Sequence, residues 1–135
     1  MSDLPDTSLS ASSAFVRGAG LVIDSVAGDA VTGHIDAGAD HHQPWGLVHG
    51  GVYASAVETA CSIGASTAVD AAGQFAVGLS NHTDFLRAHR EGRLDVRAVP
   101  IHQGRTGQLW QCDIAREDGQ LVAQGRVRLQ NVPKP

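Results

Sequence analysis

The chain has 135 residues, of which 42 % are hydrophobic and 18 % are charged, so its size and composition fit one folded domain and exclude a disordered chain. The net charge of −4 argues against general nucleic-acid binding. No apolar run of about 18 residues is present, which predicts no membrane span, and residues 1–15 lack the basic and apolar regions of a secretory signal. We therefore expect a cytoplasmic protein.

The N-terminal residues 1–19 are expected to form a loose tail with a short helix, ahead of a single domain at 20–131. Within residues 20–38, two β-like runs are separated by a glycine-containing turn at 27–29, which predicts a hairpin. Apolar and polar residues alternate in the second run, so one of its faces is predicted to be buried. That face holds Val31, Gly33 and Ile35.

Residues 51–69 form the longest segment without a helix-breaking pair, and they are rich in alanine and apolar nearly all round. This pattern predicts a buried helix of about 27 Å, long enough to cross a small domain. Between Asp40 and Asp70, Glu58 is the one Asp, Glu, Lys or Arg residue. A carboxylate in such a helix is costly to bury without a partner, so its presence needs an explanation.

After this helix the hydrophobic pattern changes to a period of two, which predicts β-strands separated by glycine-containing turns. The last strand is the clearest, and its odd-numbered residues from Leu121 to Leu129 are expected to share one face. Pro100 predicts an edge position or a bulge, and residues 131–135 are expected to be frayed. The four predicted strands are 75–86, 93–101, 109–115 and 121–129.

The predicted order of elements is therefore β-β-α-β-β-β-β, which belongs to the α+β class. One hydrophobic helix among antiparallel strands is buried most simply if the sheet curls around it. Because the helix is apolar on nearly all sides, we expect a second subunit to cover the side that the sheet leaves open.

The segment His49-Gly50-Gly51 begins the predicted helix, where the first amide groups have no intrahelical acceptor and the helix dipole is positive. Such a terminus can bind a carbonyl oxygen or an oxyanion, although the two glycines could equally serve a tight turn. Gly50 and Glu58 lie about 12 Å apart along one helix, too far for one chain to bring both to a reacting carbon. Two antiparallel helices related by a two-fold axis would bring Gly50 of one subunit to Glu58 of the other. Ser62, one turn after Glu58, could reach the same substrate.

Cysteine and histidine give no sign of a metal centre. Cys61 and Cys112 lack metal-type spacing, so two free thiols in a reducing compartment are expected. The six histidines other than His49 form no convincing ligand set, and no metal is expected. The absence of a Gly-x-Ser-x-Gly motif argues against a Ser-His-Asp hydrolase.

Five of the ten Lys and Arg residues fall within residues 87–105, against only two acidic residues. A local basic patch on an acidic chain suits a small polyanion, although a solvated strand face would show the same pattern. The five residues are Arg87, Arg90, Arg93, Arg97 and Arg105.

The segment "QPWGLVHGGVYASAVET" resembles the central segment of hotdog-fold acyl-coenzyme A thioesterases, in particular the 4-hydroxybenzoyl-CoA thioesterase subfamily with a catalytic Glu on the central helix. The similarity continues through "AVGLSNHTDFLR" and "EGRLDVRAVPIH" and covers roughly residues 20–130. It implies an antiparallel sheet wrapped around one long helix, and hydrolysis of a hydroxybenzoyl- or phenylacetyl-type CoA thioester. It also implies a homodimer that pairs into a tetramer, and no cofactor, because coenzyme A is part of the substrate.

The resemblance also implies roles for individual residues. The Gly50 N–H would polarise the thioester carbonyl, and Glu58 of the opposing subunit would attack that carbon or activate a water. Gln43 would orient the carbonyl or the water, His49 would shape the helix start, and Ser62 stands where the subfamily has a threonine. The contacts implied for the nucleotide end of coenzyme A are Arg87, Arg105 and Thr106, while Asn81 and His82 are expected near the pocket.

Two other functions remain open from the sequence. One is a non-catalytic hotdog module that binds acyl-CoA as a sensor, which would have no need for Glu58. The other is a hotdog dehydratase, which is less favoured because that chemistry calls for a His and Asp pair at the helix start, and His49 has no matching acid.

Overall fold

The computed structural model describes residues 4–135. Two short helices, η1 (Leu9–Ala11) and α1 (Ala14–Ala19), precede the sheet. Strands β1 (Val22–Ala27) and β2 (Ala30–Ala37) lead through η2 (Ala39–His41) to the long helix α2 (Gly50–Val69) and the short turn η3 (Asp70–Ala72). Four strands follow: β3 (Gln74–Phe85), β4 (Gly92–Gln103), β5 (Gly107–Arg116) and β6 (Leu121–Pro133).

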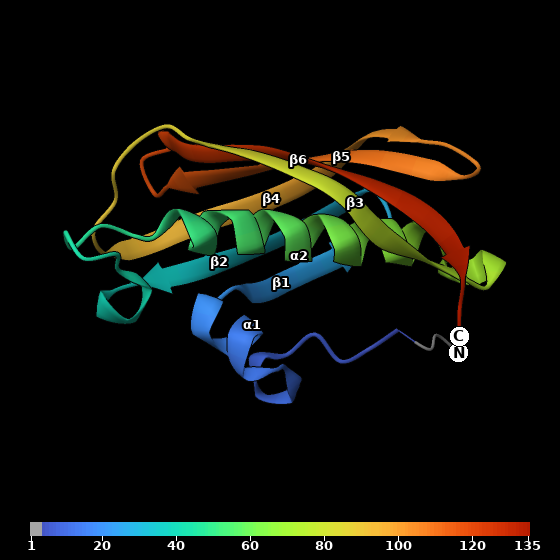
Figure 1. Ribbon diagram of the computed structural model, residues 1–135, viewed down its shortest axis with the longest axis horizontal. Coiled ribbons are helices and arrows are strands. Elements are labelled where there is room, and N and C mark those ends of the chain that lie inside the picture. The colour runs from blue at the N-terminus through green and yellow to red at the C-terminus, as the bar shows by residue number, and fades with distance from the viewer. Residues whose placement is uncertain (1–3) are drawn as a thin grey trace.

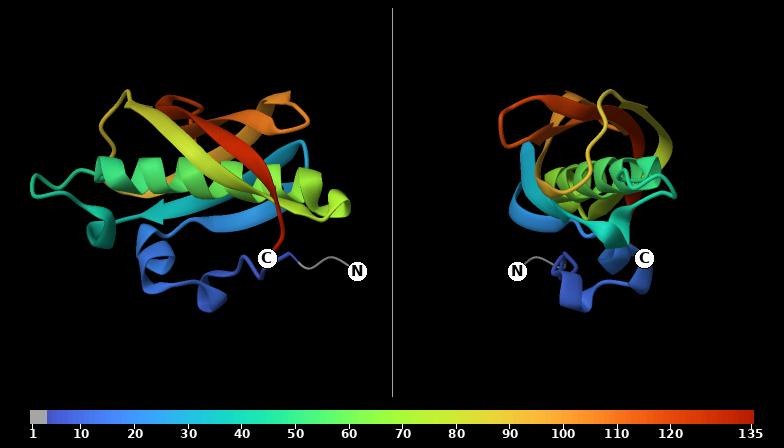
Figure 2. Two further views of the ribbon diagram at one scale, coloured as in Figure 1. Left: turned by 45° about the vertical axis from the view of Figure 1, so that its right-hand side comes forward. Right: turned by 90° about the vertical axis from the view of Figure 1, so that its left-hand side faces the viewer.

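The strands form one six-stranded sheet in the order β1-β2-β4-β5-β6-β3, and every neighbouring pair is antiparallel. The sheet curls around α2, which runs along its concave side (Figure 1). The view along the helix shows the sheet surrounding α2 on most sides, with α1 and the N-terminal segment on the remaining one (Figure 2). This α+β arrangement is the hotdog fold that the resemblance predicts.

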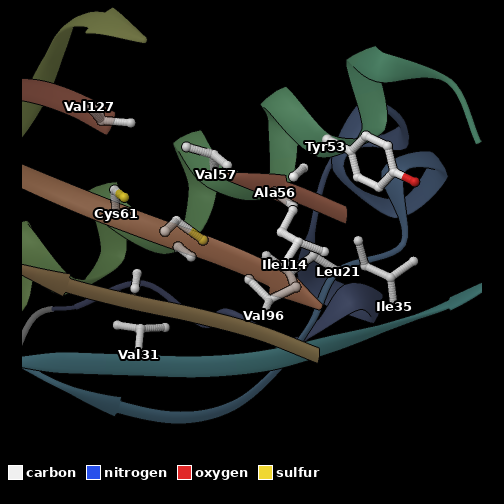
Figure 3. Close-up of a cluster of buried hydrophobic side chains, with 14 of the residues drawn as sticks. Leu21, Val31, Ile35, Tyr53, Ala56, Val57, Cys61, Val96, Ile114 and Val127 are labelled. Atoms are coloured by element: carbon white, nitrogen blue, oxygen red, sulfur yellow. The ribbon is translucent and has the colours of Figure 1, made fainter. Parts of the chain in front are cut away.

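The core lies between the sheet and one side of α2. The buried residues of the helix recur every three or four positions, from Tyr53 through Val57 and Cys61 to Ala65, as expected for one helical face. They pack against the inward side chains of β2, β4, β5 and β6, among them Val31, the predicted inward residue of β2 (Figure 3).

Gly64 allows the closest approach between α2 and the sheet. A Cβ at this position would lie 2.4 Å from the fully buried ring of Trp110 on β5. Trp110 therefore occupies the space that any other side chain at position 64 would need, and the helix can lie directly on the sheet.

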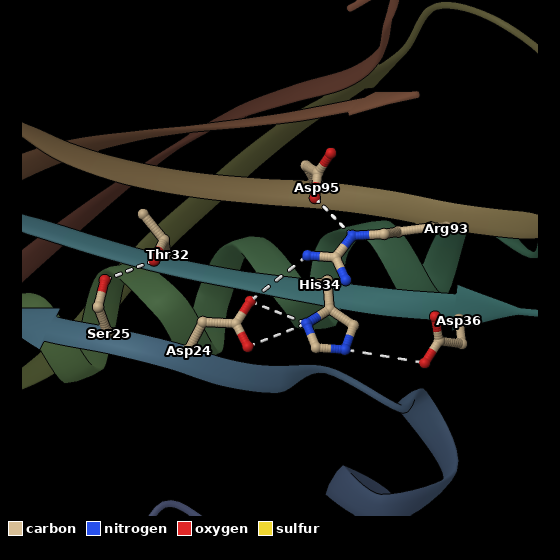
Figure 4. A network of polar contacts seen from close by, with 7 residues as sticks. All are labelled: Asp24, Ser25, Thr32, His34, Asp36, Arg93 and Asp95. Carbon is tan, nitrogen blue, oxygen red and sulfur yellow. Dashed lines mark hydrogen bonds and ion pairs between the residues drawn. The ribbon is translucent and has the colours of Figure 1, made fainter. Parts of the chain in front are cut away.

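The outer face of the sheet is polar where β1, β2 and β4 run side by side (Figure 4). His34 places Nδ1 2.8 Å from Asp24, and Arg93 donates to Asp95 at 2.9 Å while its guanidinium lies 3.9 Å from Asp24. Asp36 completes the group, 3.7 Å from His34 Nε2. These ion pairs give the sheet a solvated outer surface and leave the concave side as its apolar face.

Three expectations about strands differ in outcome. Pro100 adjoins a register shift in the β4–β5 ladder, which confirms the predicted bulge. The odd-numbered residues of the last strand are expected to share one face opposite Val122, but Val122 is buried together with Ala123, because the β5–β6 register shifts between Ile114 and Ala115. Residues 131–135 are not simply frayed: β6 continues to Pro133 because it pairs with the start of β3.

Candidate active site

Helix α2 begins at Gly50, and the preceding residue His49 caps it. The His49 ring accepts a hydrogen bond from the Gly51 N–H at its Nδ1, at 2.8 Å, and the His49 carbonyl accepts from the Val52 N–H at 2.9 Å. Among residues 4–135, the N–H of Gly50 has no acceptor. A free amide at the positive end of a 20-residue helix can therefore stabilise negative charge on a ligand oxygen.

The loop before α2 places Gln43 on the same side as Gly50. The Gln43 side-chain oxygen accepts hydrogen bonds from the N–H groups of Trp45 at 2.6 Å and Leu47 at 3.4 Å, which fixes the orientation of the amide. Its NH2 group has no partner among the described residues and can still donate. Gln43 and Gly50 both line a cavity of about 340 Å³, together with Arg87.

Two aromatic side chains form a wall of this cavity. The rings of Tyr53 and Phe85 lie 5.9 Å apart at 41°, and a Cβ on Gly50 would lie 2.5 Å from the Phe85 ring. Burial raises the pKa of Tyr53, whose hydroxyl has no hydrogen-bond partner in the described part of the chain. Because an unpaired buried hydroxyl costs about 1–3 kcal/mol, a ligand or water that bonds to it would be stabilised.

Glu58 lies two turns further along α2, half-buried against the edge strand β3. Its carboxylate accepts hydrogen bonds from the Asn81 amide at 3.2 Å and from the Ser62 hydroxyl at 3.3 Å. Gly78 on β3 makes room for it, since a Cβ there would lie 2.5 Å from Glu58 Oε2. Neutral donors thus hold the carboxylate in place, and no Lys or Arg among the described residues pairs with it.

Asn81 is the side chain that links the helix to the edge strand. In addition to Glu58, its amide donates to the carbonyl of Ala54 at 3.0 Å. The sequence predicts Asn81 near the pocket; the structure brings it to Glu58, and it is not one of the residues that line the cavity at Gly50. The side chain of His82, the next residue on β3, is 84 % exposed and lies 3.3 Å from Asp84, so within one chain it does not contact Glu58, and its place near the pocket stays a prediction.

Arg105 and Thr106 belong to a different part of the molecule from Arg87. They line a cavity of about 540 Å³ at the β4–β5 turn, beside Arg128 and His102. Arg87 instead lies near the cavity at Gly50, where it donates to the Leu121 carbonyl at 2.6 Å. One chain therefore does not bring the three predicted coenzyme A contacts together.

A buried polar cluster that the sequence does not reveal holds the β4–β5 turn. Gln108 is 2 % exposed and donates to Asn131 at 2.8 Å and to the Ala65 carbonyl at 3.0 Å. Asn131 in turn donates to the carbonyls of Gly104 and Arg105 at 3.2 and 3.3 Å. Both amides stand at ordinary strand positions, and only their burial shows that they fix the turn that carries Arg105.

The basic residues of 87–105 do not form one patch. Arg93 is paired with Asp95 and Asp24 on the outer face, and Arg90 donates to the Gly46 carbonyl at 3.4 Å. Arg87 and Arg105 adjoin different cavities, so each could meet an anion separately.

The two thiols lie in the core. Cys61 and Cys112 are free and buried, and the hydrogen bond with Cys112 together with burial raises the pKa of Cys61, so this thiol is kept protonated and unreactive. Within residues 4–135 there is no group of His, Cys, Asp and Glu that could hold a metal ion. Among the same residues, no helix is long and apolar enough to cross a membrane.

Comparisons with known proteins show the family of this chain. The sequence model of the thioesterase superfamily matches residues 46–123. A Mycobacterium tuberculosis protein named as a candidate esterase, Rv1847, is 36 % identical over 115 residues, 84 % of this chain and 82 % of that protein. Its solved structure superimposes with a TM-score of 0.86 at 35 % identity, over 90 % of this chain and 98 % of that chain.

Two further solved structures carry thioesterase in their names. The Haemophilus influenzae thioesterase HI1161 gives a TM-score of 0.84 at 30 % identity, over 96 % of this chain and 93 % of that one. A glutamine-to-alanine variant of the Pseudomonas aeruginosa thioesterase PA1618 gives a TM-score of 0.78 at 28 % identity, over 84 % of this chain and 82 % of that one.

Proposed function

The chain belongs to the thioesterase superfamily and is a thioester hydrolase, and from this premise we propose that it cleaves an aromatic acyl-CoA into free acid and coenzyme A at a site shared between two subunits. The observation that carries the proposal is the pairing, on one helix, of an unbonded amide at Gly50 with a held carboxylate at Glu58. Thioester hydrolysis needs these two groups: a donor for the developing oxyanion, and a nucleophile or base.

The two groups must come from different chains, because about 12 Å of helix separates them. Strand β3 offers the surface for a second copy. It is a 12-residue strand at the edge of the sheet, unpaired on its outer side within the described residues, and Leu79 and Phe85 on it are 54 % and 57 % exposed. A long exposed edge of this kind is suited to antiparallel pairing with its own copy.

The contacts of Asn81 support this pairing in register. Ala54 is the midpoint between Gly50 and Glu58, and its carbonyl is bonded by Asn81 from the edge strand. A two-fold axis near Asn81 would relate the two α2 helices so that Gly50 of each faces Glu58 of the other.

We assign the roles as follows. The Gly50 N–H donates to the thioester oxygen, and the free NH2 of Gln43 orients the same oxygen or a water. His49 holds the helix start through its bond to Gly51. Glu58 from the partner subunit acts on the carbonyl carbon, and Ser62 and Asn81 hold its carboxylate. Arg87 from one subunit, with Arg105 and Thr106 from another, holds the phosphates of coenzyme A.

We propose that Glu58 attacks the carbonyl carbon directly. Its surroundings are mostly apolar and its two donors are neutral, and a poorly hydrated carboxylate is the better nucleophile. The thiolate of coenzyme A would leave, and water would open the resulting mixed anhydride. In one turnover in water labelled with heavy oxygen, label on the Glu58 peptide would support this route, and hydroxylamine should trap the anhydride. Label in the acid alone, with no trapped adduct, would favour a water activated by Glu58.

The acyl group is proposed to be aromatic, of the hydroxybenzoyl or phenylacetyl type, because the segment 43–59 is similar to the subfamily that takes such groups. A kinetic screen of the purified protein against aromatic and aliphatic acyl-CoAs, by release of the coenzyme A thiol, tests the proposal. Hydrolysis of aromatic thioesters with kcat/KM above about 10⁴ M⁻¹s⁻¹ is expected. Tight binding of acyl-CoA with no thiol release would instead indicate the sensor.

A mixing experiment tests whether the site is shared. Chains with Glu58→Ala and chains with Gln43→Ala should each be nearly inactive alone. After mixing and exchange, half of the dimers are hybrids with one intact site each, so about a quarter of the wild-type activity should return. If each chain held its own complete site, the hybrids would contain only damaged sites, and no activity would be regained.

A further inference from the structure

A network of buried amides lies beneath the turn between β4 and β5. Gln108 and Asn131 are 2 % and 7 % exposed, and they are the two buried amide side chains among residues 4–135, none of whose charged side chains is buried. Gln108 Nε2 donates to Asn131 Oδ1 at 2.8 Å and to the Ala65 carbonyl on α2 at 3.0 Å. Gln108 Oε1 accepts from Trp110 Nε1 at 2.8 Å. The network therefore joins the core to the strand β6 that carries Asn131.

Asn131 bonds the backbone of the turn at three successive residues. Its side-chain nitrogen donates to the carbonyls of Gly104 and Arg105 at 3.2 and 3.3 Å, and its backbone N–H donates to the Thr106 carbonyl at 2.9 Å. The bond from the Gly104 N–H to the Gly107 carbonyl, at 2.8 Å, closes the turn but leaves those three carbonyls to Asn131. Asn131 therefore fixes the direction in which the side chains at 105 and 106 leave the backbone.

The turn presents cations that have no carboxylate beside them. Arg105 and Thr106 line the cavity of about 540 Å³ together with Arg128 and His102, and no Asp or Glu is among its lining residues. Neither arginine forms an ion pair within the part of the chain that the structure describes. Because no ion pair holds Arg105, the backbone of the turn decides where its guanidinium lies, and a mobile turn would have to be ordered at each binding event.

Stability alone does not call for amides at positions 108 and 131. When both partners of a buried hydrogen bond are replaced by apolar groups of the same shape, the fold is about as stable or more stable, whereas the loss of one partner leaves the other unsatisfied. An apolar pair could therefore fill this part of the core beside Trp110. Such a pair could not bond the carbonyls of residues 104–106, and these bonds are the feature that the amides add.

We propose that Asn131, held in place by Gln108, is a positioning residue for the coenzyme A end of the substrate, because it presets the turn so that Arg105 and Thr106 meet a phosphate without prior ordering. This inference rests on the proposed function, in which these two side chains hold phosphates of coenzyme A. Gly50 lies at the other end of α2 from this turn (Figure 1). Loss of the network should therefore weaken binding of the nucleotide part and leave the chemical step unchanged.

The test variant replaces both amides by apolar residues of similar size, Gln108→Met with Asn131→Leu, so that no buried group is left unsatisfied. Gln124→Leu is the matched control: it also removes a hydrogen-bonded amide from β6, which donates to Asp113 at 2.8 Å, and Gln124 does not line the cavity. The substrates are 4-hydroxybenzoyl-CoA and S-(4-hydroxybenzoyl)pantetheine, which has the same thioester but no nucleotide and no phosphate. Each protein is first checked by thermal melting.

The double variant should raise KM for the CoA thioester about 5- to 10-fold, keep kcat within about twofold, and change neither constant for the pantetheine thioester. Gln124→Leu should match the wild type on both substrates. Arg105→Ala should raise KM for the CoA thioester in the wild type but add little to the double variant, because the unfixed turn has already lost that contact.

A purely structural role of the network would affect both thioesters alike. An unchanged KM for the CoA thioester, an equal rise for both thioesters, or fully additive effects of Arg105→Ala would overturn the proposal. If the double variant does not fold, Asn131→Ser is measured against the same criteria, since its side chain is too short to bond both turn carbonyls.

Calorimetric binding of coenzyme A itself separates this inference from the hydrolase proposal. If the wild type cleaves no thioester, yet binds coenzyme A at least about fivefold more tightly than the double variant does, the positioning role stands and hydrolysis is refuted. Cleavage with equal affinity of both proteins for coenzyme A refutes the positioning role alone. If the wild type neither cleaves the thioester nor binds coenzyme A, both proposals fail.

Discussion

The two sides of helix α2 differ in what they are made of and in what they contact. The covered side carries Tyr53, Val57, Cys61 and Ala65, all nearly inaccessible and packed on the sheet. The open side is half-buried at most and rich in hydroxyl groups, at the helical spacing of Ser55, Thr59, Ser62 and Ser66.

Glu58 stands at the border of these two sides, against β3, with one hydrogen bond to the helix and one to the strand. The difference between the two sides of α2 explains why a carboxylate is tolerated in a helix whose sequence is apolar on nearly all sides. The Glu58 side chain lies outside the packed face and accepts hydrogen bonds from polar groups at the edge of that face. Its carboxylate is therefore only partly removed from water. Changes on the open side should therefore affect catalysis, and changes on the covered side should affect stability.

The largest effect is expected for Glu58→Ala. Loss of the carboxylate should lower kcat on the best acyl-CoA by at least about 10³-fold, equivalent to about 4 kcal/mol of transition-state stabilisation, with the fold retained. Steady-state thiol release and a thermal melt on the same sample measure the two quantities. A variant that keeps most of its kcat would remove the catalytic role and favour an acyl-CoA sensor.

Substitutions on the covered side of α2 should change the stability of the fold instead of the reaction rate. In Gly64→Ala the new Cβ would meet the Trp110 ring at 2.4 Å, so overpacking should destabilise the fold by about 1–3 kcal/mol and lower Tm by several degrees. Gly18→Ala is the control, because nothing lies within 4 Å of its Cβ position in α1. That control should leave Tm unchanged or raise it. Equal rises in Tm for both variants would contradict the tight packing of α2 on β5.

The border between the two sides can be tested through Gly78. The Cβ of Gly78→Ala would lie 2.5 Å from Glu58 Oε2, so the carboxylate must move, and kcat should fall about 10- to 100-fold. Gly38→Ala serves as the control, since its Cβ position is open. An unchanged kcat for Gly78→Ala would mean that the Glu58 carboxylate can act from more than one position. Strand β3 would then not be needed to position it.

The smallest effect is expected at the surface, where Arg87 is proposed to hold a phosphate of coenzyme A. Arg87→Ala should raise KM severalfold with a smaller change in kcat, because ground state and transition state share the contact. Added salt should weaken the difference. Arg93→Ala is the matched control, since Arg93 is already paired on the outer face. If KM at low ionic strength is the same for both variants, Arg87 does not contact the phosphates.

Most of the helices and strands could be predicted from the hydrophobic periodicity of the sequence and from its glycine-containing turns. The helix at 51–69 and the strands after it agree with α2 and β3–β6 within a few residues, because the hydrophobic period and the glycine turns act over short distances. The strand order does not follow from these patterns. A period of two tells which face of β3 is apolar but not that β3 pairs with β6 at the edge of the sheet.

The sequence by itself determined the α+β order of elements, the start of α2 at the His49-Gly50-Gly51 segment and the isolation of Glu58, because these depend on residue type and on short spacing, whereas the hotdog fold was implied by the resemblance of residues 43–59 to a known family. Only the tertiary structure decided that Asn81 and Gly78 position that carboxylate, that Gln108 and Asn131 fix the turn of Arg105, and that His82 does not contact Glu58 within one chain. It also decided that Arg87 and Arg105 adjoin separate cavities. The physical reason is that these contacts join residues more than 15 positions apart, and their geometry depends on strand order and on register shifts that no local period encodes.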